Sequence, residues 1–506
     1  MARVVVVGGG LGGLAVAARL ARTRHEVTVL DRGATLGGSL RGWDVDGLEI
    51  PAPPASFTMP AVMRDLFRKT GRPIEDVLEL AAAEPARRYL FEDGSILDLP
   101  NGNRAASIAA FDEALGGRAG AEWEALLVRG RDMWDVLRRD VVEQPTARPR
   151  DLVRALASRR KLETLQAGRS LHTVGRAALS DVRARLILDS YAAAVGADPR
   201  RAPGALALLP YLEHAFGLWH VVGGMPRLLD ALADRAALRG AEFRTRAEVV
   251  EITVTDGRVH GLRLSSGERL DADVVVVAMD VRAAARLVSA GPAPWPTGRR
   301  GAGMSRFTAV LSSPTHPAGA ALTATSRTHL STDERASRRR EYLEPWAAHP
   351  VETVLLGDTG AAPITVCQHQ ATGGSSYWTV SRAVPASSST EPDWGASGTA
   401  LSYAASLLDA AAARGLDLRA ASIRRTESPA DLEEKTGAPG GAVLGPPPHG
   451  LGGAFARAAN ASAVVGLYAV GASAHPGPGL PFVGMSAVLV SELIGAVPRA
   501  GGVAAP

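Results

Sequence analysis

The sequence predicts an α/β fold built around a parallel sheet. The valine run Val4–Val7 has the composition of a short strand that is buried on both faces. A glycine-rich loop follows it, then a helical stretch with small residues, and then a second apolar strand that ends at Asp31. A further apolar strand is predicted over Val464–Val470, followed by a loop rich in glycine and proline and a last helix. With 506 residues, 46% of them hydrophobic, the chain can bury the cores of two or three domains.

The loop after the first strand has the spacing Gly8-x-Gly10-x-x-Gly13. Gly8 permits a tight turn, Gly10 lets the backbone approach a pyrophosphate, and Gly13 allows the helix to pack closely on the strand. The helix that follows presents free N–H groups and a positive dipole end to the phosphates. Asp31 is in position to accept a hydrogen bond from a ribose hydroxyl. The pattern therefore predicts dinucleotide binding, with contacts from Gly8, Gly10, Leu11, Gly12, Gly13 and Asp31.

A second glycine pair, Gly37-Gly38, comes after the acidic end of the second strand. It resembles the second glycine pair of the glutathione-reductase-type flavoproteins, and this resemblance implies FAD as the dinucleotide. In that family a basic residue usually follows the pair, whereas here Ser39 stands there and Arg41 comes two positions later. The resemblance implies that the cofactor contacts on this segment come from Arg32, Gly38, Ser39 and Arg41.

Four later stretches extend the resemblance. They are FGLWHVVGGMP over 216–226, the hairpin pattern from Glu248, the segment Glu427–Gly445, and GLYAVGASAHPGPGLPFVGMSA near the end of the chain. Together with the N-terminal loop they resemble the bacterial-type phytoene desaturases and related carotenoid desaturases and isomerases. The resemblance implies that the last helix begins at the flavin. Its expected contacts are Gly471 and Ala472 at the pyrophosphate and ribityl chain, Pro481, Phe482 and Val483 at the pyrimidine edge, and Val249 at the adenine.

The same resemblance implies a discontinuous arrangement of domains. A Rossmann-like FAD-binding domain is expected over 1–70, 215–290 and 455–506, and an inserted α+β substrate domain over 71–214 and 291–454. Within the inserted domain, residues of about 105–200 alternate apolar and charged positions at helical spacing and predict a helical cap. Runs of β-branched residues over 352–384 predict a sheet at the floor of the substrate site.

Two local features bear on the chemistry. In GLEIPAPPASFTMP over 47–60, Pro51 and Pro53 stand where the family usually has an acidic residue and a glycine that approaches the isoalloxazine. Proline removes an N–H and adds bulk, so the local flavin contact is expected to differ. His475 is the titratable side chain that the resemblance places near the ring, and we expect it to serve as a proton acceptor, with packing of the turn as the alternative.

Composition excludes several other classes. The net charge is only +4, the arginines are interspersed with acids and aromatics make up 5%, which argues against a nucleic-acid groove. Cys367 is the single cysteine, so no internal disulfide is possible, and with His369 it lacks a third ligand for a metal. We expect no metal and a cytoplasmic protein, without a signal peptide or a membrane-spanning helix. Contact with the inner face of a membrane, for example through Arg338–Arg340, would be peripheral.

The expected function is FAD-dependent desaturation of a long apolar polyene or isoprenoid, with hydride transfer to flavin N5. One alternative is a flavin-dependent cyclase, saturase or isomerase of a polyene secondary metabolite, and another is a lipid-binding protein that has lost catalysis. Amine oxidation is disfavoured, since it needs an aromatic cage around the amine and the chain has only seven tyrosines. No second GxGxxG follows a strand, so reoxidation is expected from oxygen, a quinone or another carrier. Substrate identity, direction of the redox reaction and oligomeric state remain open.

Overall fold

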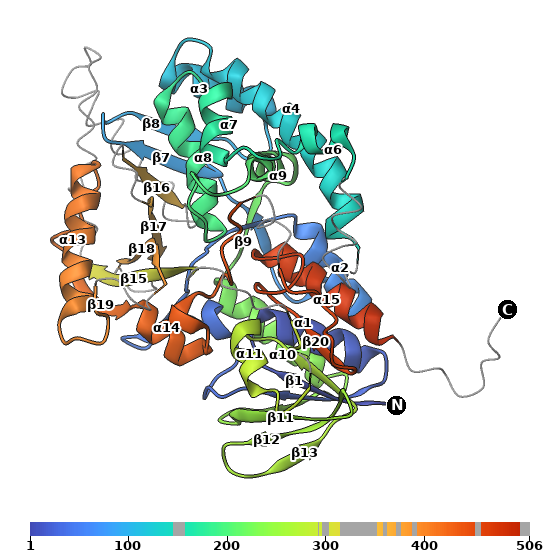
Figure 1. Cartoon of the computed structure of the whole chain (residues 1–506). Helices are drawn as coiled ribbons and strands as arrows, with labels where there is room; N and C mark the ends of the chain where they lie inside the picture. Colours follow the sequence, from blue (N-terminus) through green and yellow to red (C-terminus); the bar gives the residue numbers. More distant parts are fainter. Residues whose placement is uncertain are drawn as a thin grey trace.

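The computed structural model describes residues 1–144, 157–291, 293–295, 303–313, 352–357, 362–370, 376–386, 392–450 and 457–495. The arginine triplet Arg338–Arg340 lies outside these residues. Figure 1 shows three parts: a group of helices at the top, a mixed sheet at the left, and a lower part that contains both the first strand and the last helix.

The lower part is built on a five-stranded parallel sheet in the order β10–β2–β1–β14–β20. Its strands come from both ends and the middle of the chain: β1 (Arg3–Val7), β2 (Glu26–Leu30), β10 (Glu242–Arg244), β14 (Val274–Val277) and β20 (Leu467–Ala469). Side chains of β1 alternate between two cores, since Val4 and Val6 pack into one and Val5 and Val7 into the other. Burial on both faces explains why the strand is a run of valines.

Helices cover one face of this sheet, and a small antiparallel sheet covers the other. The helical layer packs α1 (Leu11–Arg22) against α10 (Met225–Ala237) and α15 (Leu480–Ile494), with α2 (Pro60–Thr70) beside them. On the opposite face lie β11 (Val249–Thr255), β12 (Arg258–Leu264), β13 (Arg269–Asp271) and the short helix α11 (Val281–Leu287).

The inserted part contains a seven-stranded sheet in the order β19–β15–β18–β17–β16–β7–β8, in which only β16 and β7 pair in parallel. Its strands are β7 (Arg87–Phe91), β8 (Ile96–Leu99), β15 (Met304–Ser313), β16 (Thr353–Leu356), β17 (Ile364–Gln370), β18 (Ser376–Pro385) and β19 (Ser422–Glu427). One face packs against α13 (Thr399–Ala413). The other face turns toward the helical cap. Along β7, Leu90 packs into the core between the sheet and α13, whereas Tyr89 and Phe91 pack into the core of the cap.

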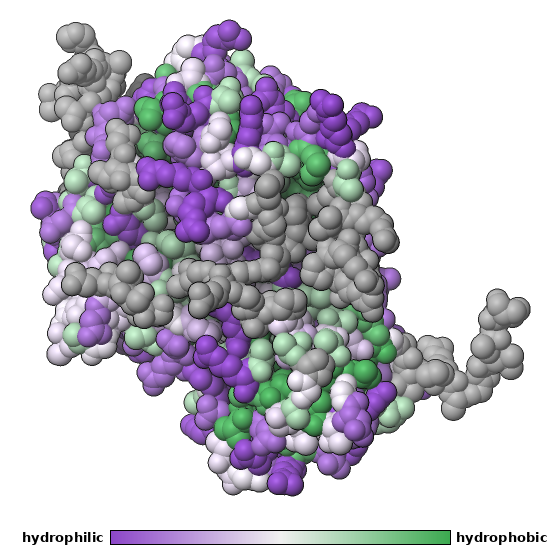
Figure 2. All heavy atoms as spheres, viewed as in Figure 1, coloured by the Kyte–Doolittle hydropathy of each residue, from purple (hydrophilic) through white to green (hydrophobic). Residues whose placement is uncertain are grey.

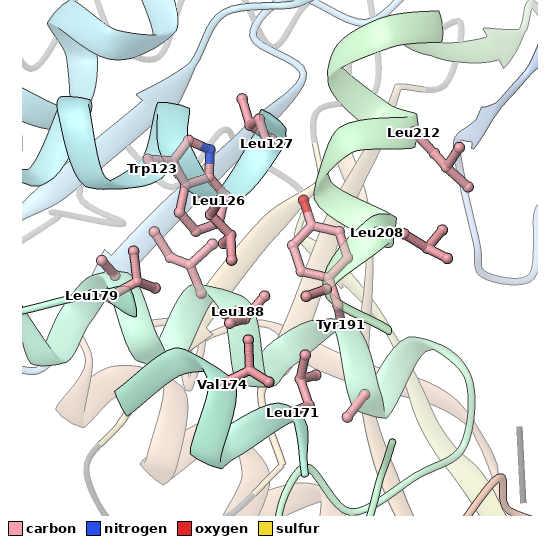
Figure 3. Packing of buried hydrophobic residues seen from close by; sticks show 14 of the residues in the cluster. Trp123, Leu126, Leu127, Leu171, Val174, Leu179, Leu188, Tyr191, Leu208 and Leu212 are labelled. Carbon is pink, nitrogen blue, oxygen red and sulfur yellow. The ribbon is translucent and has the colours of Figure 1, made fainter. Parts of the chain in front are cut away.

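The cap consists of α3 (Arg104–Leu115), α4 (Ala119–Leu137), α6 (Arg159–Thr164), α7 (Leu171–Ala178), α8 (Val182–Ala194) and α9 (Leu209–Phe216), with a π-helical turn over Arg138–Val142. Figure 3 shows leucine and valine side chains from α4, α7 and α8 pointing toward one another around Trp123. Trp123 is fully buried and stacks on Phe111 with ring centroids 4.5 Å apart. A further helix among the described residues of this inserted part is α14 (Pro429–Thr436), which lies near β15 and β19.

Short strands connect the two parts. β5 (Phe57–Thr58) and β6 (Leu80–Ala82) both pair with β9 (Leu218–Val221), and β3 (Trp43–Val45) pairs with β4 (Leu48–Ile50). Single 3₁₀ turns lie at Gly38–Leu40, Ile74–Asp76, Gly204–Leu208 and Pro439–Gly441. The predicted α/β class, with a parallel-sheet domain and an inserted α+β domain of sheet and helical cap, is confirmed. All five parallel strands lie within 1–70, 215–290 and 455–506, although the exact domain boundaries stay a prediction.

Among the described helices, none combines the length and the apolar composition that crossing a lipid bilayer requires. In Figure 2, hydrophilic residues dominate the upper surface, over the helical cap, while hydrophobic residues gather on the lower part of this face.

Gly13 provides a test of how the first helix is seated. A β-carbon on Gly13 would overlap the carbonyl oxygen of Gly8, whereas one on Gly10 would have only the Gly38 Cα as a neighbour, 4.0 Å away. We therefore expect Gly13→Ala to lower the free energy of unfolding by about 1–3 kcal/mol, because helix and loop must separate. Urea unfolding of the cofactor-free protein measures this, with Gly10→Ala as the matched control. Equal stability of Gly13→Ala and wild type would contradict the close packing.

Candidate functional site

One cavity of about 610 Å³ lies where the parallel-sheet part meets the seven-stranded sheet. Three kinds of segment line it: the loops after β1 and β2, the C-terminal loop with the start of α15, and the cap-facing side of the seven-stranded sheet together with α8. The carboxyl ends of parallel strands in an α/β sheet are where ligands bind in this fold class. The cavity therefore joins a nucleotide-type cradle to a second wall from the inserted part.

Asp31 fixes the glycine loop from below. Its Oδ2 accepts a hydrogen bond from the Gly9 N–H at 2.7 Å, and its Oδ1 accepts one from the Gly33 N–H at 2.7 Å. Each carboxylate oxygen keeps a second lone pair, and Asp31 lines the cavity, so it can still accept from a ribose hydroxyl. Gly8 has φ +109°, which a residue with a side chain rarely adopts.

The second glycine pair lies directly against the first loop. The Gly37 N–H donates to the Gly9 carbonyl at 2.8 Å, and a β-carbon on Gly38 would sit 3.4 Å from the Gly10 Cα. Gly8, Gly10, Leu11, Gly12, Gly38, Ser39 and Arg32 all line the cavity. Gly13 does not, since its role is the helix packing described above.

Arg41 is placed differently from the expectation. Its guanidinium forms ion pairs with Glu49 at 3.1 Å and Asp230 at 2.6 Å, and its Nε donates to the Leu36 carbonyl. Arg41 is not among the residues that line the cavity. Two carboxylates outside the cradle hold the cation, so Arg41 supports the loop rather than the ligand. Arg32 does reach the cavity, while its Nη2 donates to the Glu433 carbonyl at 2.8 Å.

The C-terminal loop closes the cradle. Gly471 has φ +115° and open space on its cavity side, and Gly471, Ala472 and Val483 all line the cavity. A β-carbon on Gly12 would lie 3.3 Å from both the Gly471 Cα and the Val483 side chain, so the starts of α1 and α15 are in close contact. No side chain caps either helix start, at Gly10 or at Gly479. Two uncapped helix N-termini at one cavity suit a ligand with negative charge.

The first turn of α15 divides its residues between two directions. Gly479, Leu480 and Val483 line the cavity, whereas Pro481 and Phe482 do not. The Phe482 ring packs edge-on against Trp134 of the cap, with centroids 6.4 Å apart. Helical periodicity explains this, because consecutive residues point about 100° apart and three in a row cannot share one wall. The contact predicted for Pro481 and Phe482 is therefore replaced, in this geometry, by Gly479 and Leu480.

Val249 lines the cavity at the start of β11, next to Ala247 and Glu248, on the nucleotide side. The adenine contact expected for Val249 stays a prediction.

His475 turns away from the cavity. Its Nε2 lies 2.9 Å from the Val141 carbonyl oxygen in the cap, and the residue is buried but does not line the cavity. Burial lowers its pKa to about 4, so the imidazole is neutral near pH 7. A carbonyl partner requires Nε2 to carry the proton, so this nitrogen is committed as a donor. The geometry supports the packing alternative for His475 and gives no support to proton acceptance.

The wall from the seven-stranded sheet is polar. Arg87 on β7 donates through Nη2 and Nε to Glu213 at 2.8 and 3.2 Å, and through Nη1 to Glu352 at 2.6 Å. Tyr191 on α8 donates to Glu213 at 2.7 Å. Arg87, Tyr89, Tyr191 and Glu352 all line the cavity. The two carboxylates raise the pKa of Arg87 despite its burial, so it stays charged.

The proline-rich loop at 51–56 is fixed to this wall. The Arg306 Nη1 donates to the Pro53 carbonyl at 2.6 Å, and Glu352 accepts from the Ala55 N–H at 2.9 Å and the Ser56 N–H at 3.4 Å. Pro53 and Pro54 line the cavity. These two prolines therefore face the ligand space as a rigid apolar edge, and Pro53 stands where the family that the chain resembles usually has a glycine.

Sequence reasoning missed Arg87, Glu352, Arg306 and Lys435, which line the cavity. Arg306 and Lys435 share the Glu427 carboxylate, at 3.2 and 3.1 Å. A usable signal was present only for Lys435, which falls in the segment Glu427–Gly445 that carried the resemblance. The other three are charged residues in or beside strands, and no spacing rule relates them.

The cradle fits FAD by its own geometry. Gly10 and Gly471 leave open space in the cavity that a β-carbon would fill, and two helix N-termini meet there. The Asp31 carboxylate can still accept a hydrogen bond. These are the groups that a pyrophosphate and a ribose require.

Acid should destabilise the fold through His475. Its folded pKa of about 4 is below the ordinary value of 6.5, so the unfolded chain binds more protons between these values and stability falls as pH drops through that window. We expect His475→Asn to remove about 2 kcal/mol of the stability loss between pH 7 and pH 5. Urea unfolding at several pH values measures this, with the exposed His260→Asn as control. An unchanged slope in His475→Asn would contradict the assignment.

Gly10→Ala should affect the cofactor and leave the fold intact. The protein offers room for the added methyl group, but that group occupies the space a pyrophosphate must approach. We expect FAD affinity to fall about 10- to 100-fold, the equivalent of an overpacking cost of about 1–3 kcal/mol. Titration of the cofactor-free protein with FAD, followed by flavin fluorescence, measures the dissociation constant. Wild-type affinity in this variant would show that the pyrophosphate lies elsewhere.

Comparison with known proteins identifies the family. The model of the family described as flavin containing amine oxidoreductase matches residues 11–353. The hydroxyneurosporene desaturase of Rubrivivax gelatinosus is 30% identical over 513 residues, covering 97% of this chain and 93% of that protein. The 4,4'-diapolycopene oxygenase of a Methylomonas species is 32% identical over 291 residues, which span 58% of each chain.

A solved oxidoreductase structure from Methanosarcina mazei superposes with a TM-score of 0.64 over 97% of this chain and 100% of its own, at 17% identity. At that identity the likeness concerns the fold alone. The family match over more than half of the chain, the full-length relative and the FAD-shaped cradle agree with one another. The chain belongs to the flavin containing amine oxidoreductase family and is a FAD-dependent oxidoreductase.

Proposed function

We propose that the protein desaturates a long polyene or isoprenoid. The observation that carries this proposal is the single cavity in which the FAD cradle and a wall of the inserted part face the same space. Relatives named as carotenoid desaturases support it, above all the hydroxyneurosporene desaturase that matches nearly the whole chain. FAD held by this cradle would accept a hydride from a substrate C–H bond, and the adjacent carbon would release a proton to solvent as the new double bond forms.

The chain contributes orientation, electrostatics and exclusion of water. The uncapped start of α15 places a partial positive charge at the cradle, which favours negative charge on a bound cofactor. Leu480, Val483, Pro53 and Pro54 provide apolar surface against which an unsaturated chain can lie. Glu352 and Arg306 hold the proline loop in place, so this edge is preformed before substrate binds.

A long apolar substrate dissolves in membranes rather than in water. We therefore include peripheral contact with a membrane in the proposal. Val77, which precedes β6, and Phe216 and Val222, which flank the two ends of β9, expose 46%, 37% and 44% of their surface. Exposed apolar side chains of this kind can enter the headgroup region of a bilayer.

An anaerobic titration of the FAD-loaded protein with phytoene and with neurosporene tests the proposal. We expect the oxidised-flavin absorption to bleach in proportion to the polyene that is converted, with new double bonds visible as a red shift of the polyene spectrum. Putrescine serves as the control amine and should leave the flavin oxidised. Bleaching by NAD(P)H alone would instead support a reductive saturase, and failure to bind FAD would support a lipid-binding protein.

A further inference from the structure

With His475 turned toward the cap, the proton that a desaturation releases needs another acceptor. In the described part of the chain, four carboxylate side chains and no histidine line the cavity: Asp31, Glu248, Asp280 and Glu352. The first two lie on the nucleotide side, and Asp280, which follows β14, binds the guanidinium of Arg282 through both oxygens. Glu352 is the carboxylate that belongs to the inserted part, where the substrate is proposed to lie.

Glu352 keeps room to accept a proton. It directly precedes β16, whose parallel pairing with β7 brings it beside Arg87, and it is buried while lining the cavity. Its Oε1 accepts the N–H groups of Ala55 and Ser56 in the proline loop, whereas Oε2 has Arg87 as its one partner among the described residues. A carboxylate oxygen has two lone pairs, so Oε2 can take one further bond.

Two carboxylates share one guanidinium in this wall. Arg87 binds both Glu213 and Glu352, and within the described residues neither carboxylate pairs with a second cation. Tyr191 donates to Glu213 as well, since burial raises the pKa of its phenol. Figure 3 shows Tyr191 beside leucine and valine side chains of the cap, so the excess negative charge lies next to an apolar region, where it acts strongly on a nearby cation.

Desaturation creates such a cation. The hydride takes both electrons of one C–H bond to the flavin, and the positive charge that remains on the substrate is delocalised along the polyene. When the adjacent C–H bond breaks, its electron pair forms the new double bond and its proton needs a base. A carbocation is a far stronger acid than a carboxylic acid, so even a carboxylate paired with Arg87 is basic enough.

We propose that Glu352 is a catalytic residue: its carboxylate faces the cation that hydride loss leaves on the substrate and accepts the proton from the adjacent carbon before that proton reaches solvent. The inference rests on the proposed function and adds the residue that receives the proton. Arg87 and Glu213 act through Glu352, because they hold its carboxylate in place and leave the cluster with a negative charge.

Binding of a cation mimic tests the charge without turnover. An isoprenoid that ends in a trimethylammonium group, and its uncharged isostere that ends in a tert-butyl group, are titrated into the oxidised FAD-loaded protein while tryptophan fluorescence reports binding. The quaternary nitrogen has no lone pair, so it cannot be oxidised as an amine. We expect the wild type to bind the ammonium compound about 10-fold more tightly, the effect that one nearby opposite charge has on an ionisable group. Equal affinity in the wild type would overturn the proposal.

Two substitutions separate the charge of Glu352 from its contact with the proline loop. Glu352→Gln keeps the length of the side chain and an acceptor for Ala55 and Ser56 but removes the charge, whereas Glu352→Asp keeps the charge on a shorter side chain. We expect the preference for the ammonium compound to disappear in Glu352→Gln and to survive in Glu352→Asp. The reverse result would assign Glu352 to the loop alone and overturn its role toward the cation.

Single-turnover reduction of the flavin by phytoene, without oxygen, tests the proton transfer. Glu352→Gln should slow the bleaching by about 100- to 10,000-fold, the usual contribution of a general base, because a cation that cannot lose its proton takes the hydride back. Glu213→Gln is the matched control: it also removes one carboxylate from Arg87, but Glu213 does not line the cavity, so the loss should be far smaller. Equal losses in the two variants would contradict proton transfer to Glu352.

The two proposals fail in different ways. If no polyene bleaches the flavin of the wild type, the desaturase function and the proton transfer fall together, while an ammonium preference that depends on Glu352 would still show an anionic binding site. Bleaching at the wild-type rate in Glu352→Gln would support the desaturase and remove Glu352 from the reaction.

Discussion

The close contact between Gly13 and the Gly8 carbonyl is the constraint on which the site depends. It seats α1 directly on the loop after β1, and this brings Gly12 against Gly471 and Val483. The starts of α1 and α15 therefore meet at one point, although they lie more than 400 residues apart in the chain. A side chain at Gly12 would push the two helix starts apart, so that their partial positive charges would no longer act on the same point of the cavity.

The second wall depends on charge rather than on missing side chains. Arg306 and Glu352 bind backbone groups of the proline loop, and Arg87 links Glu352 to Glu213 on α9. Charge-assisted hydrogen bonds of this kind are shorter and stronger than neutral ones, and here they connect the sheet, the cap and the loop. One network thus shapes the edge that meets an apolar ligand.

Local patterns predicted the cradle well and the opposite wall poorly. Gly8, Gly10 and Asp31 follow spacings that one strand–loop–helix unit imposes, so their placement in the cavity could be expected, and the family resemblance added Gly38. Phe482 and His475 were assigned from the family resemblance, but helical phase and the Val141 carbonyl turn them toward the cap. The pair of Arg87 and Glu352 spans 265 positions and arises from parallel pairing of β7 with β16, which no local pattern encodes.

The order of strands in the parallel sheet has a consequence for biosynthesis. β1 pairs with β2 early, but its other neighbour, β14, begins at Val274, and β20 completes the sheet only at Leu467–Ala469. During translation the nascent chain therefore carries an open strand edge and half a cradle until nearly all of the described residues have left the ribosome. The cradle also needs Gly471 and the start of α15, so it can be complete only near the end of synthesis, and an open strand edge can pair with other chains until it is covered.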